Sequence, residues 1–332
     1  MHDLIRPLVV APMAGGPSTP ALVTAATAAG ATGFLAAGYK SPPAVEAELR
    51  AVGGAYGLNI FVPGPPADGR AVERYRELLR PEAERYGVEL PALRLDDDDR
   101  FAEKVELAIA YGVPLVSFTF GVPERAVVTA LQRAGSRVLI TVTSAGEAAR
   151  ALAAGPDALI AQGGGAGGHS ATTSPAGFTG DTTTLEVLAA VKAEVPIVAA
   201  GGVAVAADVE RLLAAGAVAV QCGTAFLLAD EAGTRPAQRE FMLAGRATAT
   251  VVTRAFTGHP ARALRNRFTD TYTPAAPIGY PAVHHLTAPI RAAAAQAADA
   301  EGINLWAGTG FRSARSGTTA ALVATLMPGS QS

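Results

Sequence analysis

The chain has 332 residues, of which 49% are hydrophobic and 17% charged, and its formal net charge is −2. This composition supplies a large apolar core but no basic stripe, which argues against a nucleic-acid partner held through its phosphates. The single cysteine, Cys222, excludes an intrachain disulfide and a zinc cluster.

Neither the N-terminus nor the apolar runs carry a targeting or membrane signal. The N-terminus, including His2, lacks the basic segment and apolar core of a signal peptide. The apolar runs are broken by Gly and Pro and are well below the ~20 residues that span a bilayer. We therefore expect a cytoplasmic protein without a membrane partner, and the sequence leaves open whether it forms a homo-oligomer.

Short β-branched runs alternate with Ala/Leu-rich segments of helical spacing, a pattern typical of a parallel sheet. The eight predicted strands are Leu8–Ala11, Gly33–Ala36, Gly57–Phe61, Leu115–Phe118, Val138–Val142, Ala158–Ala161, Ile197–Ala200 and Val218–Gln221. The predicted helices between them are Thr19–Ala29, Pro43–Val52, Phe101–Tyr111, Glu124–Ala134, Ala145–Ala154, Leu185–Ala193 and Ala206–Ala215, with one more from Ala225. Eight such units predict a (β/α)8 TIM barrel, and an open doubly wound sheet is the alternative.

The third connection is long and contains a further helical pattern, Arg70–Glu84. An acidic run, Asp96–Asp99, follows that pattern and precedes the helix predicted at Phe101. We interpret the run as a solvated loop, because a metal site would need additional convergent ligands. No metal site is expected.

After the eighth strand the alternation ends, and residues 234–300 predict a small helical and loop subdomain that caps the barrel formed by residues 1–233. Arg235–Phe256 has a helical pattern, and Thr273–Pro289 is rich in Pro, aromatics and His. Residues 301–332 are expected to return to the barrel, with Leu305–Gly310 at its mouth and a loose tail after Pro328.

Glycines gather where the last two barrel strands end. Gly201-Gly202 follows the seventh strand and Gly223-Thr224 follows the eighth. Barrel enzymes often bind phosphate at these two loops through bare backbone N–H groups and a helix N-terminus. The pattern predicts a phosphate site, with ordinary turn glycines as the alternative.

A second glycine-rich loop, Gly163–His169, follows the sixth strand. It matches G-x-G-x-x-G formally, but Ser170–Gly180 reads as loop, whereas a dinucleotide-binding turn opens a helix at once. A flat aromatic cofactor against bare backbone explains the glycines better than a flexible linker does. His169 ends the loop and is the candidate base, because an imidazole exchanges protons near neutral pH.

The remaining histidines are weaker candidates for chemistry. His259 lies in a Gly-His-Pro turn and is interpreted as a surface residue. His284 and His285 lie in the cap, where one of the two could face the site.

Together these segments resemble the nitronate monooxygenase family, over nearly the full length. The matching segments are Ala11–Pro20, Gly57–Phe61, Ser117–Gly121, Gln162–His169, Ala200–Gly202, Gln221–Thr224, Tyr280–Thr287 and Leu305–Gly308. The last two resemble the first class of the family.

The resemblance implies an FMN-dependent enzyme that oxidises alkyl nitronates with O2 to a carbonyl compound and nitrite, with His169 as the catalytic base. The implied FMN contacts are Met13, Asn59, Gln162, Gly167, Gly201, Gly202, Gln221, Gly223 and Thr224. The implied substrate contacts are Thr119, Tyr280, His284 and His285.

The chain departs from the family pattern near the reacting carbon. Gly165 stands where the family usually has Glu, Ser170-Ala171 replaces a common Arg-Gly pair, and Thr119 occupies the middle of the S-F-x-F-G segment. Two other functions therefore stay open: an FMN-dependent NAD(P)H reductase of an enoyl thioester or a quinone, and a non-catalytic barrel that binds a phosphorylated ligand.

Overall fold

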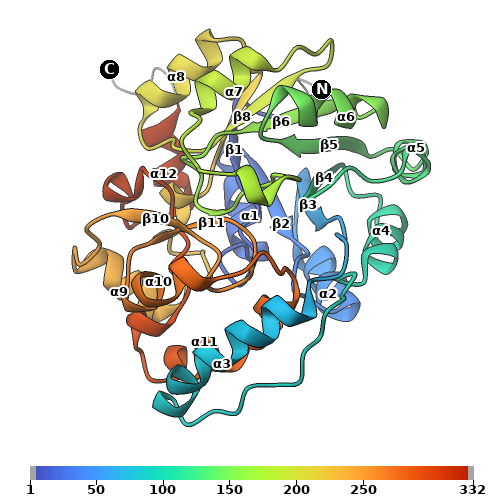
Figure 1. Ribbon diagram of the computed structural model, residues 1–332. Helices are drawn as coiled ribbons and strands as arrows, with labels where there is room; N and C mark the ends of the chain where they lie inside the picture. Colours follow the sequence, from blue (N-terminus) through green and yellow to red (C-terminus); the bar gives the residue numbers. More distant parts are fainter. Residues whose placement is uncertain (1–4, 328–332) are drawn as a thin grey trace.

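The computed structural model describes residues 5–327, so His2 and the tail after Pro328 lie outside the described residues. Eight parallel strands close into a barrel, which confirms the predicted (β/α)8 architecture and excludes the open sheet (Figure 1). The barrel strands are β1 (Leu8–Val10), β2 (Thr32–Ala36), β3 (Tyr56–Phe61), β4 (Leu115–Thr119), β5 (Arg137–Val142), β6 (Ala158–Gln162), β8 (Ile197–Ala200) and β9 (Ala219–Cys222). Closure occurs where β1 pairs on one side with β2 and on the other with β9.

Helices surround the barrel on its outer face. They are α1 (Pro20–Ala28), α2 (Pro42–Ala51), α4 (Phe101–Ala110), α5 (Arg125–Arg133), α6 (Ala145–Ala153), α7 (Thr184–Ala190), α8 (Ala206–Ala214) and α12 (Thr319–Leu326). Polar caps fix several of their starts: Thr19 accepts from the Leu22 amide at α1, and Thr183 forms a capping box with Glu186 at α7. Such caps satisfy amides that have no partner within the helix.

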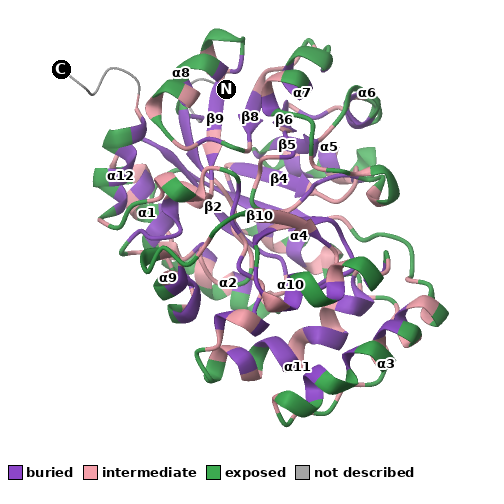
Figure 2. Cartoon of the chain, turned by 60° about the vertical axis from the view of Figure 1, so that its left-hand side comes forward, coloured by how far each residue is buried: buried purple, intermediate pink, exposed green. Residues whose placement is uncertain are grey.

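The strands are the most buried part of the molecule (Figure 2). Inside the barrel, Val9, Phe34, Leu115 and Ile160 form one cluster with inward-facing neighbours from other strands. A larger apolar cluster lies between the strands and the outer helices. Burial on both faces explains why the strands read as continuous apolar runs rather than alternating ones.

The cap combines two distant parts of the chain. Helix α3 (Gly69–Arg85), from the third connection, packs against α11 (Ala282–Gln296) in one apolar cluster, and the two helices lie at the bottom of Figure 1. The predicted domain boundary at residue 233 stays a prediction. That boundary assigns α3 to the barrel, whereas the side chains of α3 pack against the cap. Local sequence patterns do not reveal this packing, because it depends on contacts across about 200 residues.

The predicted helix over Arg235–Phe256 is wrong beyond residue 243. Helix α9 covers Pro236–Leu243, Gly245 adopts φ +66°, and β10 (Thr250–Thr253) follows. The Thr-Val-Val-Thr run of β10 favours a strand because β-branched side chains fit a pleated sheet better than a helix.

A three-stranded antiparallel sheet therefore belongs to the cap, where only helices and loops were expected. Its order is β10, β11 (Ala261–Leu264) and β7, a two-residue strand formed by Gly168 and His169. In this pairing Ala261 lies opposite His169 and Arg262 opposite Gly168. The glycine-rich loop is thus part of the cap's sheet. The short helix α10 (Arg267–Tyr272) follows β11.

The interpretation of the acidic run as a solvated loop holds for Asp96 and Asp98, which are exposed, but not for Asp97 and Asp99, which are half-buried. Asp97 Oδ2 lies 2.8 Å from His285 Nε2, and Asp99 Oδ2 lies 2.7 Å from Nζ of the fully buried Lys104. Asp99 also accepts the amide of Tyr39, which has φ +69°. The run joins the third connection to the barrel mouth and to α11.

Within residues 5–327, no helix is both long and apolar enough to cross a membrane.

The ion pair between Glu82 of α3 and Arg267 of α10 provides a stability test. Glu82 is 3% exposed, and its Oε2 accepts from Arg267 Nη1 at 2.7 Å. We expect Glu82→Gln to lower the free energy of unfolding by about 2 to 3 kcal/mol, because it leaves a half-buried guanidinium without its carboxylate. Urea unfolding measures the loss.

The matched control is Glu77→Gln in the same helix, where the pair with Arg80 is about half exposed on both sides. That substitution should leave the free energy of unfolding nearly unchanged, because solvent screens an exposed ion pair. Equal losses in the two variants would show that the α3–α10 contact contributes nothing specific.

Candidate functional site

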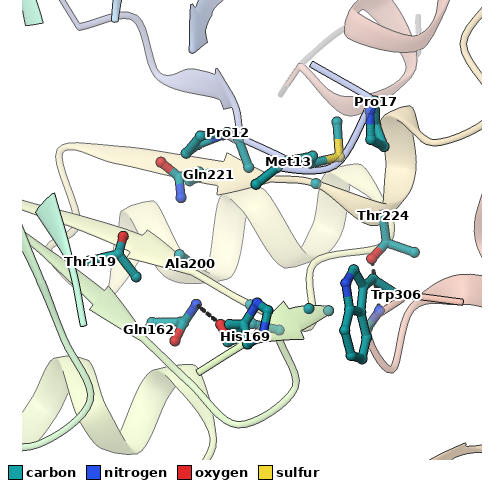
Figure 3. A pocket seen from close by; sticks show the side chains of 18 of the residues that line it. Pro12, Met13, Pro17, Thr119, Gln162, His169, Ala200, Gln221, Thr224 and Trp306 are labelled. Atoms are coloured by element: carbon teal, nitrogen blue, oxygen red, sulfur yellow. Dashed lines mark hydrogen bonds between the residues drawn. The ribbon is translucent and has the colours of Figure 1, made fainter. Parts of the chain in front are cut away.

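A pocket opens at the C-terminal ends of the barrel strands, where functional groups of such barrels gather. All nine predicted cofactor contacts line it, as do His169 and Thr119, whereas Tyr280, His284 and His285 do not. Figure 3 shows the lining side chains converging from several strands and from the segment around Trp306. The structure therefore brings together the residues that the sequence selected strand by strand.

Thr224 and the glycines predicted to bind phosphate all line this pocket. Gly201 and Gly202 have φ values of +107° and +72°, which lets their backbone turn tightly after β8. Thr224 begins the short 3-10 helix η2 (Thr224–Phe226), and its Oγ1 accepts from the Gly308 amide at 2.8 Å. The Thr224 hydroxyl hydrogen remains available to an anion.

At two positions of the glycine-rich loop, neighbouring backbone leaves no room for a side chain. A Cβ on Gly164 would lie 2.2 Å from the Gly180 carbonyl oxygen, and one on Gly167 would lie 2.4 Å from the Gly308 amide nitrogen. Protein backbone thus occupies the space beside these two positions. The flexible-linker alternative is wrong, and a cofactor is not the sole reason for the glycines.

Two amide side chains in the pocket, Asn59 and Gln221, differ in their hydrogen-bond partners. Asn59 Oδ1 accepts from Ser117 Oγ and from Thr119 Oγ1, both at 2.9 Å, which leaves the Asn59 Nδ2 donor for a ligand. Gln221 Oε1 is buried and accepts from none of the described residues. Figure 3 shows the Gln221 side chain beside Pro12 and Met13. A buried acceptor without a donor is costly, so Gln221 fits a ligand that offers an N–H or O–H group.

Gln162 holds the loop that carries His169. Its Nε2 donates to the His169 carbonyl at 3.2 Å, drawn as a dashed line in Figure 3, and its Oε1 accepts the Ala171 amide at 2.7 Å. The two bonds fix the backbone on both sides of residue 170. Gln162 lines the predicted cofactor site, but its visible contacts position the loop.

The His169 imidazole is held by the cap and enclosed by aromatic rings. Its Nε2 lies 2.9 Å from Thr257 Oγ1, and its ring lies 5.3 Å from the Trp306 ring and 5.3 Å from that of Phe120. Burial, followed by the charges of His259 and Arg291, lowers the pKa of His169 well below its usual range. The ring is therefore neutral at pH 7, the state that a base requires.

The sequence-based interpretation of His259 as a surface residue is wrong. It is 7% exposed, its Nε2 donates to the Ser170 carbonyl at 3.0 Å, and burial lowers its pKa to about 4. Its Gly-His-Pro turn reads as exposed in sequence, but that turn faces the His169 loop.

The other predicted substrate contacts lie behind the pocket wall. His284 stacks on Tyr39 at 4.1 Å, and His285 pairs with Asp97. The Tyr280 ring lies 6.0 Å from that of His169. None of the three lines the pocket, and of the three only Tyr280 has a ring contact with His169.

Sequence reasoning missed several polar or aromatic lining residues, among them Arg235, Gln238, Asn304 and Trp306. Arg235 Nη1 donates to Asn304 Oδ1 at 3.1 Å, and Gln238 Nε2 donates to the Trp306 carbonyl at 2.9 Å. Trp306 belongs to a segment that the sequence did single out. Arg235 and Gln238 carry no signal of their own, because they belong to an ordinary helical pattern.

Comparison with known proteins assigns the chain to a family. The family model described as nitronate monooxygenase matches residues 1–329. The chain belongs to the nitronate monooxygenase family. It is thus an oxidoreductase of a flavin-dependent family.

Individual relatives agree with this assignment. A probable nitronate monooxygenase of Staphylococcus saprophyticus subsp. saprophyticus is 34% identical over 314 residues, which are 91% of this chain and 88% of the relative. One from Staphylococcus aureus (strain Newman) is 31% identical over 319 residues, 93% of this chain and 89% of the relative.

Two solved structures are similar along almost the whole chain. A nitroalkane oxidase from Streptomyces ansochromogenes has a TM-score of 0.93 at 44% identity, covering 98% of this chain and 95% of its own. FabK from Thermotoga maritima has a TM-score of 0.73 at 24% identity, covering 98% of this chain and 92% of its own, and so shares the fold.

The pocket's donors and acceptors suit a flavin. The glycine turn and Thr224 hydroxyl suit a phosphate, and the orphaned Gln221 Oε1 and the Asn59 Nδ2 suit the hydrogen-bonding edge of a polar ring system. Among the described residues, no group of three His, Cys, Asp or Glu side chains is arranged to hold a metal ion.

Gly201→Ala tests whether the glycines after β8 belong to a phosphate-binding site. An added Cβ would lie 2.8 Å from the Gly163 carbonyl oxygen, at a backbone φ of +107° that side chains rarely adopt. We expect at least a tenfold weaker affinity for added FMN, measured by quenching of flavin fluorescence.

Gly216→Ala is the matched control, because Gly216 has φ +101° but no atom within 4 Å of the place that a Cβ would take, and it lies outside the pocket lining. It carries the same backbone strain and should retain FMN affinity within about twofold. Equal weakening in both variants would remove Gly201 from the flavin site.

Proposed function

We propose that the enzyme uses FMN to oxidise alkyl nitronates, and nitroalkanes after deprotonation, with O2 to a carbonyl compound and nitrite. The observation that carries this proposal is the neutral imidazole of His169, fixed in the same pocket as the groups suited to a flavin. A substrate bound there would lie between a proton acceptor and an electron acceptor. The 44% identical structure is named a nitroalkane oxidase, which supports this substrate class.

Gly201, Gly202, Gly223 and Thr224 would hold the FMN phosphate through backbone amides and a hydroxyl. Met13, Asn59, Gln162, Gly167 and Gln221 would contact the rest of the cofactor, with Asn59 as a donor and Gln221 as an acceptor. When bound, FMN supplies the redox chemistry by accepting electrons from the substrate and passing them to O2.

His169 would act on the substrate's α-carbon. A nitroalkane must lose its α-proton before it becomes an electron-rich nitronate, and a neutral imidazole can accept that proton. The imidazolium that results would attract the nitronate anion. The enclosing rings of Trp306 and Phe120 limit access of water, which strengthens this attraction.

The departures from the family pattern leave the site without a carboxylate at residue 165. A Cβ on Gly165 would lie 2.9 Å from Thr309 Oγ1 and 3.1 Å from the Gly202 Cα, so the local packing leaves little room for a side chain. Ser170 is buried and its amide donates to the Pro260 carbonyl at 2.9 Å. Gly165 and Ser170 therefore bring no charged side chain to the loop that carries His169.

Anaerobic flavin reduction tests the function directly. With FMN bound, addition of an alkyl nitronate should bleach the flavin absorbance, whereas NADH or NADPH should leave it unchanged. Bleaching by a reduced nicotinamide alone would indicate the reductase. Failure to take up FMN would indicate a non-catalytic barrel.

If His169 is the base, replacing it should slow turnover of a nitroalkane more than turnover of a nitronate. His169→Asn should retain FMN yet lower kcat/KM for a neutral nitroalkane by about 10²–10⁴-fold, because a positioned base contributes that much. Turnover of the preformed nitronate should fall far less, since that substrate needs no deprotonation. Equal, small losses on both would exclude His169 as the base.

The lowered pKa of His169 predicts the acid side of the pH profile. Only the neutral ring accepts a proton, so kcat/KM for the nitroalkane should fall as pH drops through the folded-state pKa, well below 6.5. Between pH 6.5 and 8 this group should cause no change. A fall in wild-type activity centred near pH 6.5 that His169→Asn abolishes would contradict the lowered pKa.

A further inference from the structure

Thr257 lies in the turn between β10 and β11 and contacts the proposed base. Its side chain is 2% exposed, and its Oγ1 lies 2.9 Å from His169 Nε2 and 3.3 Å from the His259 carbonyl oxygen. No sequence motif singles out this residue, and it is not among the residues that line the pocket.

Thr257 Oγ1 has one hydrogen to donate, and two acceptors lie within reach: the His259 carbonyl at 3.3 Å and His169 Nε2 at 2.9 Å. The His259 amide lies 3.5 Å from the same oxygen. A base needs its lone pair on the nitrogen that faces the substrate, so the proposed role of His169 selects the arrangement in which Thr257 donates to the His259 carbonyl. Its oxygen is then the acceptor for an N–H group on His169 Nε2. The neutral imidazole consequently carries its hydrogen on Nε2 and its lone pair on Nδ1, which bonds to none of the described residues.

The turn around Thr257 is itself firmly placed. The Ser170 amide donates to the Pro260 carbonyl at 2.9 Å, and His259 Nε2 donates to the Ser170 carbonyl at 3.0 Å. With Ala261 paired to His169, residues 257–261 wrap around the backbone that carries the imidazole. Thr257 is therefore held rigidly relative to the ring.

We propose that Thr257 is a positioning residue that fixes the His169 tautomer, so that Nδ1 is the atom that takes the substrate proton. This inference rests on the proposed function. In the step, the α-C–H bond of the nitroalkane breaks, its electron pair moves into the nitro group to give the nitronate, and the proton goes to Nδ1. The hydrogen bond from Nε2–H to Thr257 Oγ1 is also present in the imidazolium. Proton transfer to Nδ1 therefore requires no rearrangement on the Nε2 side of the ring.

Thr257→Val and Thr257→Ser test the inference together. Valine keeps the shape of threonine without its acceptor, so the Nε2–H group loses its partner and the Nδ1–H tautomer gains population. We expect kcat/KM for a neutral nitroalkane to fall about 10- to 100-fold, mainly in kcat. Turnover of preformed nitronate should stay within about threefold, and serine should restore nitroalkane turnover to within about threefold of wild type.

Thr253→Val is the matched control, because Thr253 is also 2% exposed, lies on β10 of the same hairpin and bonds Thr273 rather than His169. It should leave the ratio of nitroalkane to nitronate turnover unchanged. FMN content and the melting temperature, measured for every variant, report on folding.

Each outcome decides the inference. A lower nitroalkane-to-nitronate ratio in Thr257→Val alone, restored by serine, supports it. A ratio equal to that of wild type, or an equal fall with both substrates in a folded, FMN-loaded variant, overturns it. If Thr257→Val does not fold, an unrestored ratio in Thr257→Ser overturns it. Wild-type enzyme that turns over neither substrate would instead overturn the proposed function.

Discussion

The site depends on one interaction, the pairing of a two-residue strand at the end of the glycine-rich loop with a strand of the cap. Gly168 and His169 belong by sequence to the barrel, but their backbone pairs with Arg262 and Ala261 of β11. The barrel side holds the same loop through Gln162, which bonds the backbone of His169 and Ala171. The imidazole is thus fixed from both sides, and neither the barrel nor the cap would suffice alone.

This double attachment also sets the charge state of the imidazole. His169 is covered by the rings of Phe120 from the barrel, Tyr280 from the cap and Trp306 from the C-terminal segment. The cap also brings His259 and Arg291 near it, and burial with these charges keeps the ring neutral. Burial disfavours the imidazolium, so the His169 ring stays neutral at pH 7, whereas an imidazole in bulk water is partly protonated near its ordinary pKa. Arg262 strengthens the attachment by donating from Nε to the Gly164 carbonyl at 2.7 Å and from Nη2 to the Gly180 carbonyl at 2.9 Å.

The sequence predicted what local patterns encode. All eight barrel strands follow from apolar runs bounded by turns, and the pocket-lining glycines follow from their places after strands. What depends on distant contacts was missed: β7 is two residues long, β11 finds its partner about 90 residues away, and α3 packs with α11 across about 200. The same reason explains His259 and Asp97, which read as exposed polar residues until the segments that cover them are in place. Arg235 and Asn304 meet only because the chain returns to the barrel mouth.

Hydrogen–deuterium exchange of the Arg262→Met variant, compared with wild type, tests most directly whether the loop that carries His169 and the cap form one unit. The substitution removes three bonds from β11, to Gly164, Gly180 and Thr250, without touching His169 or the proposed flavin contacts. We expect exchange to rise together in the segments 163–172 and 255–264, because the two share one small sheet. Faster exchange confined to 255–264, with 163–172 as protected as in wild type, would contradict it.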